Sequence, residues 1–406
     1  MRKTTIAACL LLLPAAGAFS QKADTIPVPV DSGYLNVEGG RLYYETAGAG
    51  DYIVLLHDGL LHRVVWDGQF FELAKHYRVV RYDRRGYGKS SVPQAPFSNV
   101  GDLNQLFTQL KIDEAVVFGM SSGGRLAIDF TLKYPDKVNG LVLVGAVVSG
   151  YGYSTHFNTR GGRLKSHSEI SEPSRFIRYF GWEDPYEISP DNIEAKKAFM
   201  KLLEANPGNF NEALDNFASP PDRPAVKSLS EIKVPTLVLV GENDIPDVHA
   251  HSGVIEAGIP NARREIVPRA GHLIPFEQPE AFNAVVFRFL NSLDFISILN
   301  SQGVSAAVQY FHKKREVDPG YTPFEENQMN ALGYASLQQG RIEEAIELFT
   351  LNTIAFPESA NTFDSLGEAY LTAGNKELAI KNYEKSLELN PQNQNAADQL
   401  KKLRGN

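Results

Sequence analysis

The chain has 406 residues, enough for two domains with a sizeable core. Its 43% hydrophobic and 22% charged residues are ordinary for a globular protein. The net charge of −8 supplies neither the basic surface that attracts nucleic acid nor a polybasic patch for anionic lipid. We therefore expect no nucleic-acid partner.

The first twenty residues predict a secretory signal peptide. Arg2 and Lys3 precede the apolar run 6–13, which is too short to span a bilayer, and the small residues 15–18 follow. Cys9, the chain's single cysteine, follows Ile-Ala-Ala as in a lipoprotein processing box, but most of the apolar run comes after it, which favours ordinary cleavage. The expectation is an exported protein, periplasmic or secreted, without disulfides and without a membrane span.

Between residues 33 and 293, β-rich apolar segments alternate with longer helical or loop stretches, which predicts an α/β fold around a mostly parallel sheet. We expect a hairpin at 37–47 and an amphipathic helix at 99–111. The segments expected as strands are 52–56, 78–82, 115–118, 141–144 and 236–240.

Residues 146–232 break the alternation and carry many aromatic side chains among polar ones. An insertion of this length needs packing of its own, so we expect a mainly helical cap that lies over the sheet and lines a pocket. The alternative is an irregular surface excursion.

Residues 330–393 repeat with a period of 34. The recurring pairs are Leu332/Leu366, Gly333/Gly367, Ala335/Ala369, Leu337/Leu371, Gly340/Gly374, Ala345/Ala379, Ile346/Ile380, Phe349/Tyr383 and Pro357/Pro391. This pattern resembles the tetratricopeptide repeat (TPR), two antiparallel helices per unit. We expect a small all-α domain at 294–406, with an atypical first helix pair at 295–317 that docks on the preceding domain. Its expected role is protein partnership or self-association, and the alternative is covering an apolar face of that domain.

The stretch before and after Ser121 predicts a nucleophile elbow. An apolar, β-branched segment runs into Gly119-Met-Ser121-Ser-Gly123, a G-x-S-x-G pentapeptide, and a helix-like sequence follows. The two glycines remove β-carbons that would clash where the chain reverses, so the Ser121 hydroxyl would stand exposed above the sheet. An isolated pentapeptide of this kind is equally compatible with a Gly/Ser-rich surface turn.

Two further elements follow in chain order. Asp244 comes directly after the expected strand 236–240, and loops at the carboxyl ends of parallel strands open onto the site. His272 lies in the sequence Arg-Ala-Gly-His-Leu-Ile-Pro-Phe-Glu-Gln-Pro. The order Ser, acid, His resembles that of capped, single-domain α/β-hydrolases, and the resemblance extends over residues 33–293.

That resemblance implies a catalytic triad. A serine hydroxyl needs an imidazole to take its proton, and the imidazole needs a carboxylate that fixes its tautomer. Ser121 is the implied nucleophile, His272 the base and Asp244 the acid. Asp247 could replace Asp244 if the loop is built differently, whereas Glu242 is expected to point away.

The resemblance also implies an oxyanion hole formed by the backbone N–H groups of Gly59 and Ser122. Relatives usually have His-Gly-x in the first of these loops, and this chain has His-Asp-Gly. The carboxylate of Asp58 would oppose the developing negative charge unless it turns outward or pairs with a cation such as Arg63 or Arg85.

Other residues near these motifs are expected to support the site. By resemblance, His57 bonds loop backbone, and Asp83 and Gly88 form loop scaffolding. Trp66 lies in a stretch that is similar to lactone- and ester-hydrolysing relatives; it could wall the pocket and contact substrate, and packing in the core is the equal alternative.

We expect neither a metal nor a cofactor. His249 and His251 are two apart and could chelate in principle, but no partner carboxylate pattern accompanies them, and no Gly-rich phosphate loop follows a strand. A serine at the elbow also excludes haloalkane dehalogenases and epoxide hydrolases, which need an aspartate there.

The expected function is hydrolysis of a small carboxylic ester or lactone through an acyl-enzyme. Peptide or carbon–carbon bond hydrolysis by the same triad remains an alternative, because fold does not set the substrate. A non-catalytic binding scaffold dominated by the TPR region is the alternative from another class.

Overall fold

The computed structural model describes residues 28–160, 173–209 and 217–405. The expected signal peptide lies outside these residues, and so do two parts of the expected cap. The strands are β1 Val30–Val37, β2 Gly40–Ala47, β3 Tyr52–Leu56, β4 Arg78–Tyr82, β5 Ala115–Met120, β6 Val138–Val144, β7 Thr236–Gly241 and β8 Ala262–Val267. The helices up to the end of the cap are α1 Asp67–Leu73, α2 Asn99–Leu110, α3 Ser122–Lys133, α4 Thr155–Thr159, α5 Pro173–Arg178, the π-helical turn η4 Tyr179–Glu183 and α6 Ile193–Ala205. The later helices are α8 Pro246–Gly258, α9 Ile274–Glu277, α10 Pro279–Gln302, α11 Val304–Val317, α12 Glu326–Gln338, α13 Ile342–Ala355, α14 Ala360–Thr372, α15 Lys376–Leu389 and α16 Gln394–Arg404.

The strands form one sheet in the order β1-β2-β4-β3-β5-β6-β7-β8. The pairings β1/β2 and β2/β4 are antiparallel, and all the others are parallel. The predicted α/β fold with a mostly parallel sheet is therefore confirmed. The opening hairpin begins at Val30, earlier than the expected residue 37.

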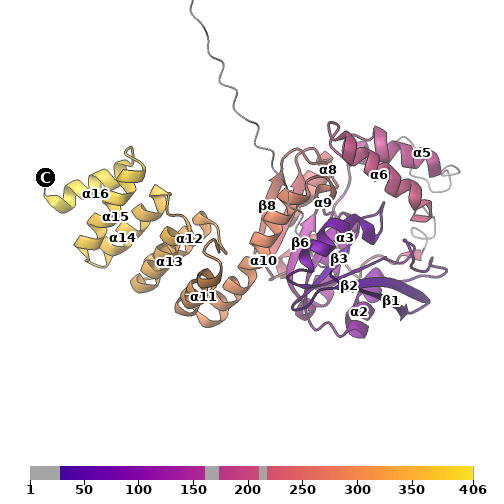
Figure 1. Cartoon of the computed structure of the whole chain (residues 1–406), viewed down its shortest axis with the longest axis horizontal. Coiled ribbons are helices and arrows are strands. Elements are labelled where there is room, and N and C mark those ends of the chain that lie inside the picture. The colour runs from indigo at the N-terminus through magenta and orange to yellow at the C-terminus, as the bar shows by residue number, and fades with distance from the viewer. Residues whose placement is uncertain (1–27, 161–172, 210–216, 406) are drawn as a thin grey trace, which may run out of the picture.

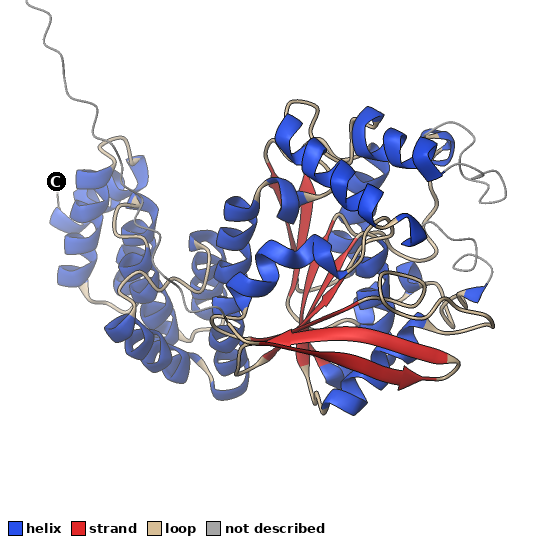
Figure 2. Ribbon diagram, turned by 45° about the vertical axis from the view of Figure 1, so that its right-hand side comes forward, coloured by secondary structure: helices blue, strands red, loops and turns tan. Residues whose placement is uncertain are grey.

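Helices cover both faces of the sheet (Figure 2). Ile53 and Leu55 of β3 pack with residues of α1 and α10, whereas Val54 and Leu56 pack with residues of α2, α3 and α8. Strands that are buried on both faces give continuous apolar runs, which is why the sequence identifies them. The edge strand β8 has the charged sequence Ala-Arg-Arg-Glu-Ile-Val and was not expected.

The described part of the cap is helical, in agreement with the expectation from the sequence. Phe199 and Leu203 of α6 are fully buried with Ile177 of α5 in the same core as the sheet. Helices α5 and α6 lie next to each other and outside the sheet (Figure 1). The cap thus has its own apolar contacts with the sheet domain.

Helix α10 belongs both to the sheet domain and to the helices that follow. Phe282 and Val286 pack in the core of the sheet, and Phe295 packs with Phe311 of α11. The helix runs without a break across residue 293, where the sequence placed the domain boundary. By length and composition α10 is apolar enough to cross a membrane, and 33% of its most apolar window is buried in this structure.

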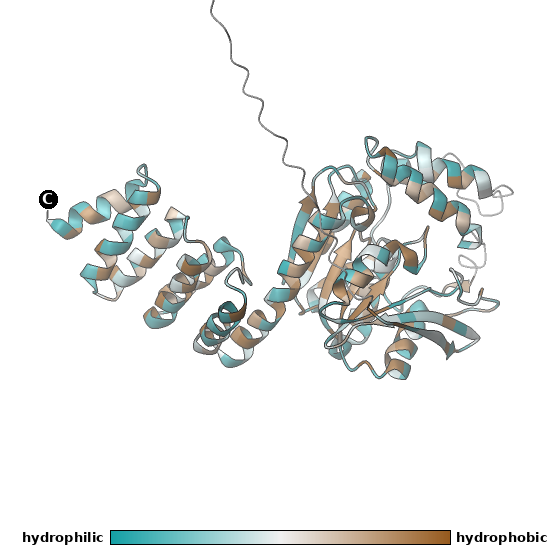
Figure 3. Ribbon diagram, in the orientation of Figure 1, coloured by the Kyte–Doolittle hydropathy of each residue, from teal (hydrophilic) through white to brown (hydrophobic). Residues whose placement is uncertain are grey.

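Helices α11 to α16 extend away from the sheet in a row, and each carries both hydrophilic and hydrophobic residues (Figures 1 and 3). A β-carbon at Gly333 would lie 2.5 Å from the ring of Phe349, and one at Gly367 would lie 3.0 Å from the ring of Tyr383. These are equivalent positions in consecutive repeats. The period of 34 therefore reflects a close helix crossing that needs glycine.

Candidate active site

Ser121 occupies a strained turn between β5 and α3. Its backbone has φ 54° and ψ −116°, in a region that residues with a side chain seldom adopt. A β-carbon at Gly119 would lie 2.5 Å from the carbonyl oxygen of Gly123, and one at Gly123 would lie 2.4 Å from that of His57. The two glycines are thus required by close backbone contacts, as expected for an elbow.

His272 and Asp244 lie side by side. Nδ1 of His272 is 2.9 Å from Oδ2 and 3.1 Å from Oδ1 of Asp244. Asp244 Oδ1 also accepts a hydrogen bond from the backbone N–H of Ile245, at 2.7 Å. The backbone N–H of His272 donates to the carbonyl oxygen of Tyr186 in the cap, at 2.8 Å. The histidine loop is therefore held from the sheet side and from the cap.

The electrostatic surroundings favour the protonated imidazole. Burial lowers the pKa of His272, but the Asp244 carboxylate, helped by Glu187, outweighs burial and raises the pKa to about 9. An imidazole that is stabilised as a cation in this way is suited to take up a proton during a reaction.

Gly145 makes room for this pair, and the sequence reasoning missed it. Its φ is +52°, and a β-carbon there would lie 2.8 Å from Nδ1 of His272 and 3.3 Å from Oδ2 of Asp244. The only signal in the sequence is a glycine directly after the apolar strand β6.

The alternative acids have other partners. Asp247 accepts hydrogen bonds from the backbone N–H and the hydroxyl of Ser154, at 2.6 and 2.7 Å. Glu242 accepts from the backbone N–H of Arg269, at 2.9 Å. Of the three carboxyl groups that the sequence singled out, Asp244 is the one that bonds to His272.

A cavity of about 260 Å³ brings the expected site residues together. The residues that line it include Ser121, Ser122, Asp58, Gly59 and His272. Its cap side is lined by Tyr153, Phe157, Arg160, Phe180 and Glu187. Ser121 and His272 therefore open onto one small space.

Asp58 is buried in this site, and its surroundings differ from the expected ones. Arg63 pairs instead with Glu45 and Asp83, and Arg85 pairs with Asp102. Of the alternatives that the sequence left open for Asp58, pairing with Arg63 or Arg85 is therefore not the one that the structure shows. The reason is that both arginines are already held by buried carboxylates of β2, of the loop after β4 and of α2.

Arg84 is the cation that lies beside this loop. Its Nη2 donates to the carbonyl oxygen of Asp58, at 2.5 Å, and to the hydroxyl oxygen of Ser122, at 2.8 Å. Nδ1 of His57 is 2.8 Å from the same carbonyl oxygen. The carbonyl of Asp58 and the N–H of Gly59 belong to one trans peptide and point in opposite directions. Anchoring the carbonyl in this way therefore fixes the direction of the Gly59 N–H.

Residues 52–279, over half of the chain, match the model of the alpha/beta hydrolase fold family. The chain belongs to this family. Residues 360–393 match the tetratricopeptide repeat. The predicted membership of both families is confirmed, and the chain is an α/β-hydrolase enzyme with C-terminal TPR helices.

Three similar proteins illustrate the chemistry found on this fold. A 2-hydroxy-6-oxononadienedioate/2-hydroxy-6-oxononatrienedioate hydrolase of Cupriavidus pinatubonensis is 30% identical over 283 residues, which cover 62% of this chain and 91% of that protein. The structure of a thermophilic esterase from Thermogutta terrifontis has a TM-score of 0.56 and 26% identity, covering 65% and 99% of the two chains. Est816, an N-acyl homoserine lactone degrading enzyme, has a TM-score of 0.55 and 25% identity, covering 63% and 100%.

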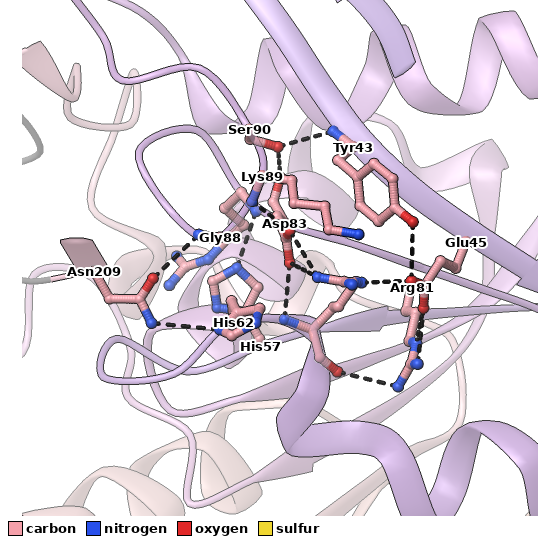
Figure 4. A network of polar contacts seen from close by, with 12 residues as sticks. Tyr43, Glu45, His57, His62, Arg81, Asp83, Gly88, Lys89, Ser90 and Asn209 are labelled. Carbon is pink, nitrogen blue, oxygen red and sulfur yellow. Dashed lines mark hydrogen bonds and ion pairs between the residues drawn. The ribbon is translucent and has the colours of Figure 1, made fainter. Parts of the chain in front are cut away.

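A polar network supports the early loops of this α/β-hydrolase (Figure 4). The side chain of Asp83 accepts from Arg63 and from the backbone N–H of Lys89, and a β-carbon at Gly88 would lie 2.3 Å from it. Nε2 of His57 accepts from the backbone N–H of Arg84, at 2.9 Å. Burial holds the pKa of His57 well below its usual value, so the ring is neutral. These contacts are structural.

Trp66 lies in the core of this α/β-hydrolase. It is fully buried and packs against Phe118 of β5 and Phe282 of α10. It does not line the cavity beside Ser121. Of the two expectations for this residue, the core-packing one fits, because α10 covers it.

The described residues contain no group of three or more His, Cys, Asp or Glu side chains placed to hold a metal ion. Nδ1 of His251 accepts a hydrogen bond from the backbone N–H of Val148, at 3.1 Å, and the ring contacts Tyr151 and Tyr153. His251 thus serves the packing of α8 against the loop after β6.

Proposed function

We propose that this α/β-hydrolase is a serine hydrolase that cleaves a small carboxylic ester or lactone. Oγ of Ser121 attacks the carbonyl carbon while His272 takes the hydroxyl proton. His272 then returns this proton to the leaving alkoxide, which departs as the alcohol or, in a lactone, becomes the free end of the acyl chain. Water activated by His272 cleaves the resulting acyl-enzyme and releases the acid.

The observation that carries the proposal is that Ser121, in its strained turn, and His272 share one cavity while Asp244 bonds to His272. The bond from Nδ1 to Asp244 leaves Nε2 as the acceptor for the serine proton. Gly59 and Ser122 supply the N–H groups for the oxyanion. Ser122 opens α3, where the first N–H groups have no partner within the helix.

The cavity favours a small substrate. Its volume of about 260 Å³ lies below the range of about 300–1,000 Å³ that is common for pockets of drug-sized ligands. Val147, Val248 and the rings of Phe157 and Phe180 give it apolar walls. The two similar solved structures named above are those of an esterase and of a lactone-degrading enzyme.

Hydrolysis of a carbon–carbon bond is the second candidate. The similarity to a 2-hydroxy-6-oxononadienedioate hydrolase favours it, and the same triad would serve. Peptide hydrolysis has no comparable observation in its favour.

A chromogenic ester assay tests the proposal. We expect turnover of 4-nitrophenyl acetate or butyrate and labelling of Ser121 by a fluorophosphonate probe. Ser121→Ala should abolish both, whereas Ser301→Ala, at an exposed serine on α10, should change neither. Equal turnover by wild type and Ser121→Ala would rule out Ser121 as the nucleophile, and absence of labelling in the wild type would favour a binding scaffold.

For the TPR region we propose recruitment of a protein partner.

For the chain as a whole we propose export after removal of the first twenty residues. Fractionation of cells and sequencing of the N-terminus of the recovered protein test this proposal. Recovery from the cytoplasm with an intact N-terminus would contradict it.

A further inference from the structure

Two carboxyl groups in the cavity are not used by the proposed acyl transfer. Asp58 follows β3, and Glu187 lies in the cap between η4 and α6. Both residues line the cavity beside Ser121, and they are only 1% and 4% exposed. They approach the cavity from the sheet and from the cap respectively.

Each carboxyl group has one oxygen engaged and one without a partner. Oδ1 of Asp58 accepts from the backbone N–H of Leu61, at 2.8 Å, and Glu187 accepts from the guanidinium of Arg160 through Oε1. Oδ2 of Asp58 and Oε2 of Glu187 are buried and find no hydrogen-bond partner in the described part of the chain. Buried polar atoms are almost always hydrogen-bonded, so a molecule in the cavity is expected to supply the partners.

Both groups lie close to the reacting centre. Each carboxyl group is near enough to His272 that a positive charge on the imidazole lowers the pKa of the carboxyl group. Burial has the larger effect and raises that pKa. The carbonyl oxygen of Glu187 also accepts from the backbone N–H of Leu273, at 3.1 Å. The missing partner is therefore expected within a few bonds of the scissile carbonyl.

The chemistry of the site points to a hydroxyl. Burial raises the pKa of both carboxyl groups. A carboxyl group accepts hydrogen bonds in its ionised form and also donates one in its protonated form. A hydroxyl suits both forms, because it donates and accepts hydrogen bonds. A cationic group suits the site less well, because the guanidinium groups of Arg125 and Arg160 line the same cavity.

We propose that the substrate is a hydroxylated ester or lactone, with its hydroxyl close to the scissile carbonyl and hydrogen-bonded to Asp58 Oδ2 and Glu187 Oε2. The apolar part of the substrate lies against Phe157 and Phe180. This inference rests on the proposed serine hydrolase activity and adds the substrate class to it.

Matched substrate pairs test it on the full chain. The 4-nitrophenyl esters of 3-hydroxybutyrate and 3-methylbutyrate differ only by a hydroxyl in place of a methyl group on the acyl side. The butyrate esters of ethylene glycol and of 1-propanol make the same exchange on the alcohol side. We expect kcat/KM to favour the hydroxyl member of at least one pair by about tenfold or more, because a site built to bond a hydroxyl rejects the analogue that lacks it.

Two substitutions at Glu187 separate hydrogen bonding from charge. Glu187→Gln and Glu187→Met both remove the charge, but only glutamine can still bond a hydroxyl. We expect the hydroxyl preference to survive in Glu187→Gln and to fall about tenfold in Glu187→Met. Glu204→Met, at an exposed glutamate on the cap helix α6, is the control that should keep the preference. Melting temperatures show whether each variant is folded.

The outcomes are distinct. Equal kcat/KM within both wild-type pairs overturns the inference even if every variant misfolds, because ordered water would then satisfy the two oxygens. An equal loss of preference in Glu187→Gln and Glu187→Met also overturns it. If the wild type hydrolyses no ester and takes no fluorophosphonate label, the proposed function itself fails, and the substrate class fails with it.

Discussion

Gly145 leaves no space for a side chain beside His272: a β-carbon there would lie 2.8 Å from Nδ1 of the ring. Substitution by alanine would therefore push the imidazole away from Asp244 and would also strain a backbone with φ +52°. We expect Gly145→Ala to lower kcat by about 10²-fold, since small misplacements of a catalytic group are costly. Steady-state kinetics on a chromogenic ester measure this.

Gly152→Ala is the matched control for this prediction. A β-carbon at Gly152 meets no atom within 4 Å. A similar loss of kcat in both variants would show that the effect is not specific to the contact with His272.

The pH dependence of activity should report the pair His272 and Asp244. Because the pKa of His272 is raised to about 9, the free enzyme gains its neutral base only as pH rises. We expect kcat/KM to increase with pH and to level off above about pH 9. Asp244→Asn should move this rise in kcat/KM to lower pH, because it removes the larger of the two carboxylate effects that oppose burial, and should lower kcat by about 10⁴-fold. If the rise stays at the same pH in Asp244→Asn, Asp244 is excluded as the cause of the raised pKa of His272.

The same shift has a consequence for stability. A histidine with a raised pKa in the folded state contributes stability in full below its unfolded value of about 6.5, and this contribution is lost as pH rises through about 9. We therefore expect the free energy of unfolding of the wild type to fall between these two pH values. Asp244→Asn should flatten the fall, and chemical denaturation at a series of pH values measures it.

Arg84 is predicted to position the oxyanion donors. It bonds the carbonyl of Asp58 and the hydroxyl of Ser122, and it lies outside the sequence pattern that identified the triad. We expect Arg84→Met to lower kcat about tenfold or more with little change in KM, because the contact acts through the Gly59 N–H in the transition state. Arg78→Met, at an exposed arginine on β4, should leave kcat unchanged. A change confined to KM would contradict the positioning role.

Gly333 should be required for the TPR helices to pack. Since a β-carbon there would lie 2.5 Å from the ring of Phe349, Gly333→Ala forces the two helices apart. We expect a loss of about 1–3 kcal/mol in the free energy of unfolding of the repeat region. Circular dichroism during thermal unfolding measures it, with Leu332→Ala, at a side chain that is 42% exposed, as the control. Equal losses in the two variants would argue against a close crossing.

The features that could be predicted from the sequence are those that depend on residues adjacent in the chain. Ser121 sits between a strand and a helix, and Asp244 directly follows a strand, so local pattern and the rules of parallel sheets were enough. The repeat at 330–393 could be recognised from the sequence as well, because residues that recur at a fixed period can be found without knowing which residues are in contact.

What the sequence did not predict depends on segments that are distant in the chain. Gly145 acquires its role from His272, and Glu187 acquires its role from the cavity that the cap closes. The surroundings of Asp58 were left open by the sequence, because nothing in it shows that Arg63 is already bound to Asp83. Trp66 could have been in the wall or in the core until the position of α10 was known.

Helix α10 connects the sheet domain to the TPR helices without an intervening loop. It starts a few residues after His272 and continues into the packing of the TPR helices, where Phe295 meets Phe311 and Phe324. A partner on a flexible tether samples a broad volume around an active site, whereas a helical connection sets one distance and one direction. A protein bound by the repeats, as proposed above, would be held at one distance and in one direction from the active site. Lengthening α10 by a turn would move the repeats by about 5.4 Å.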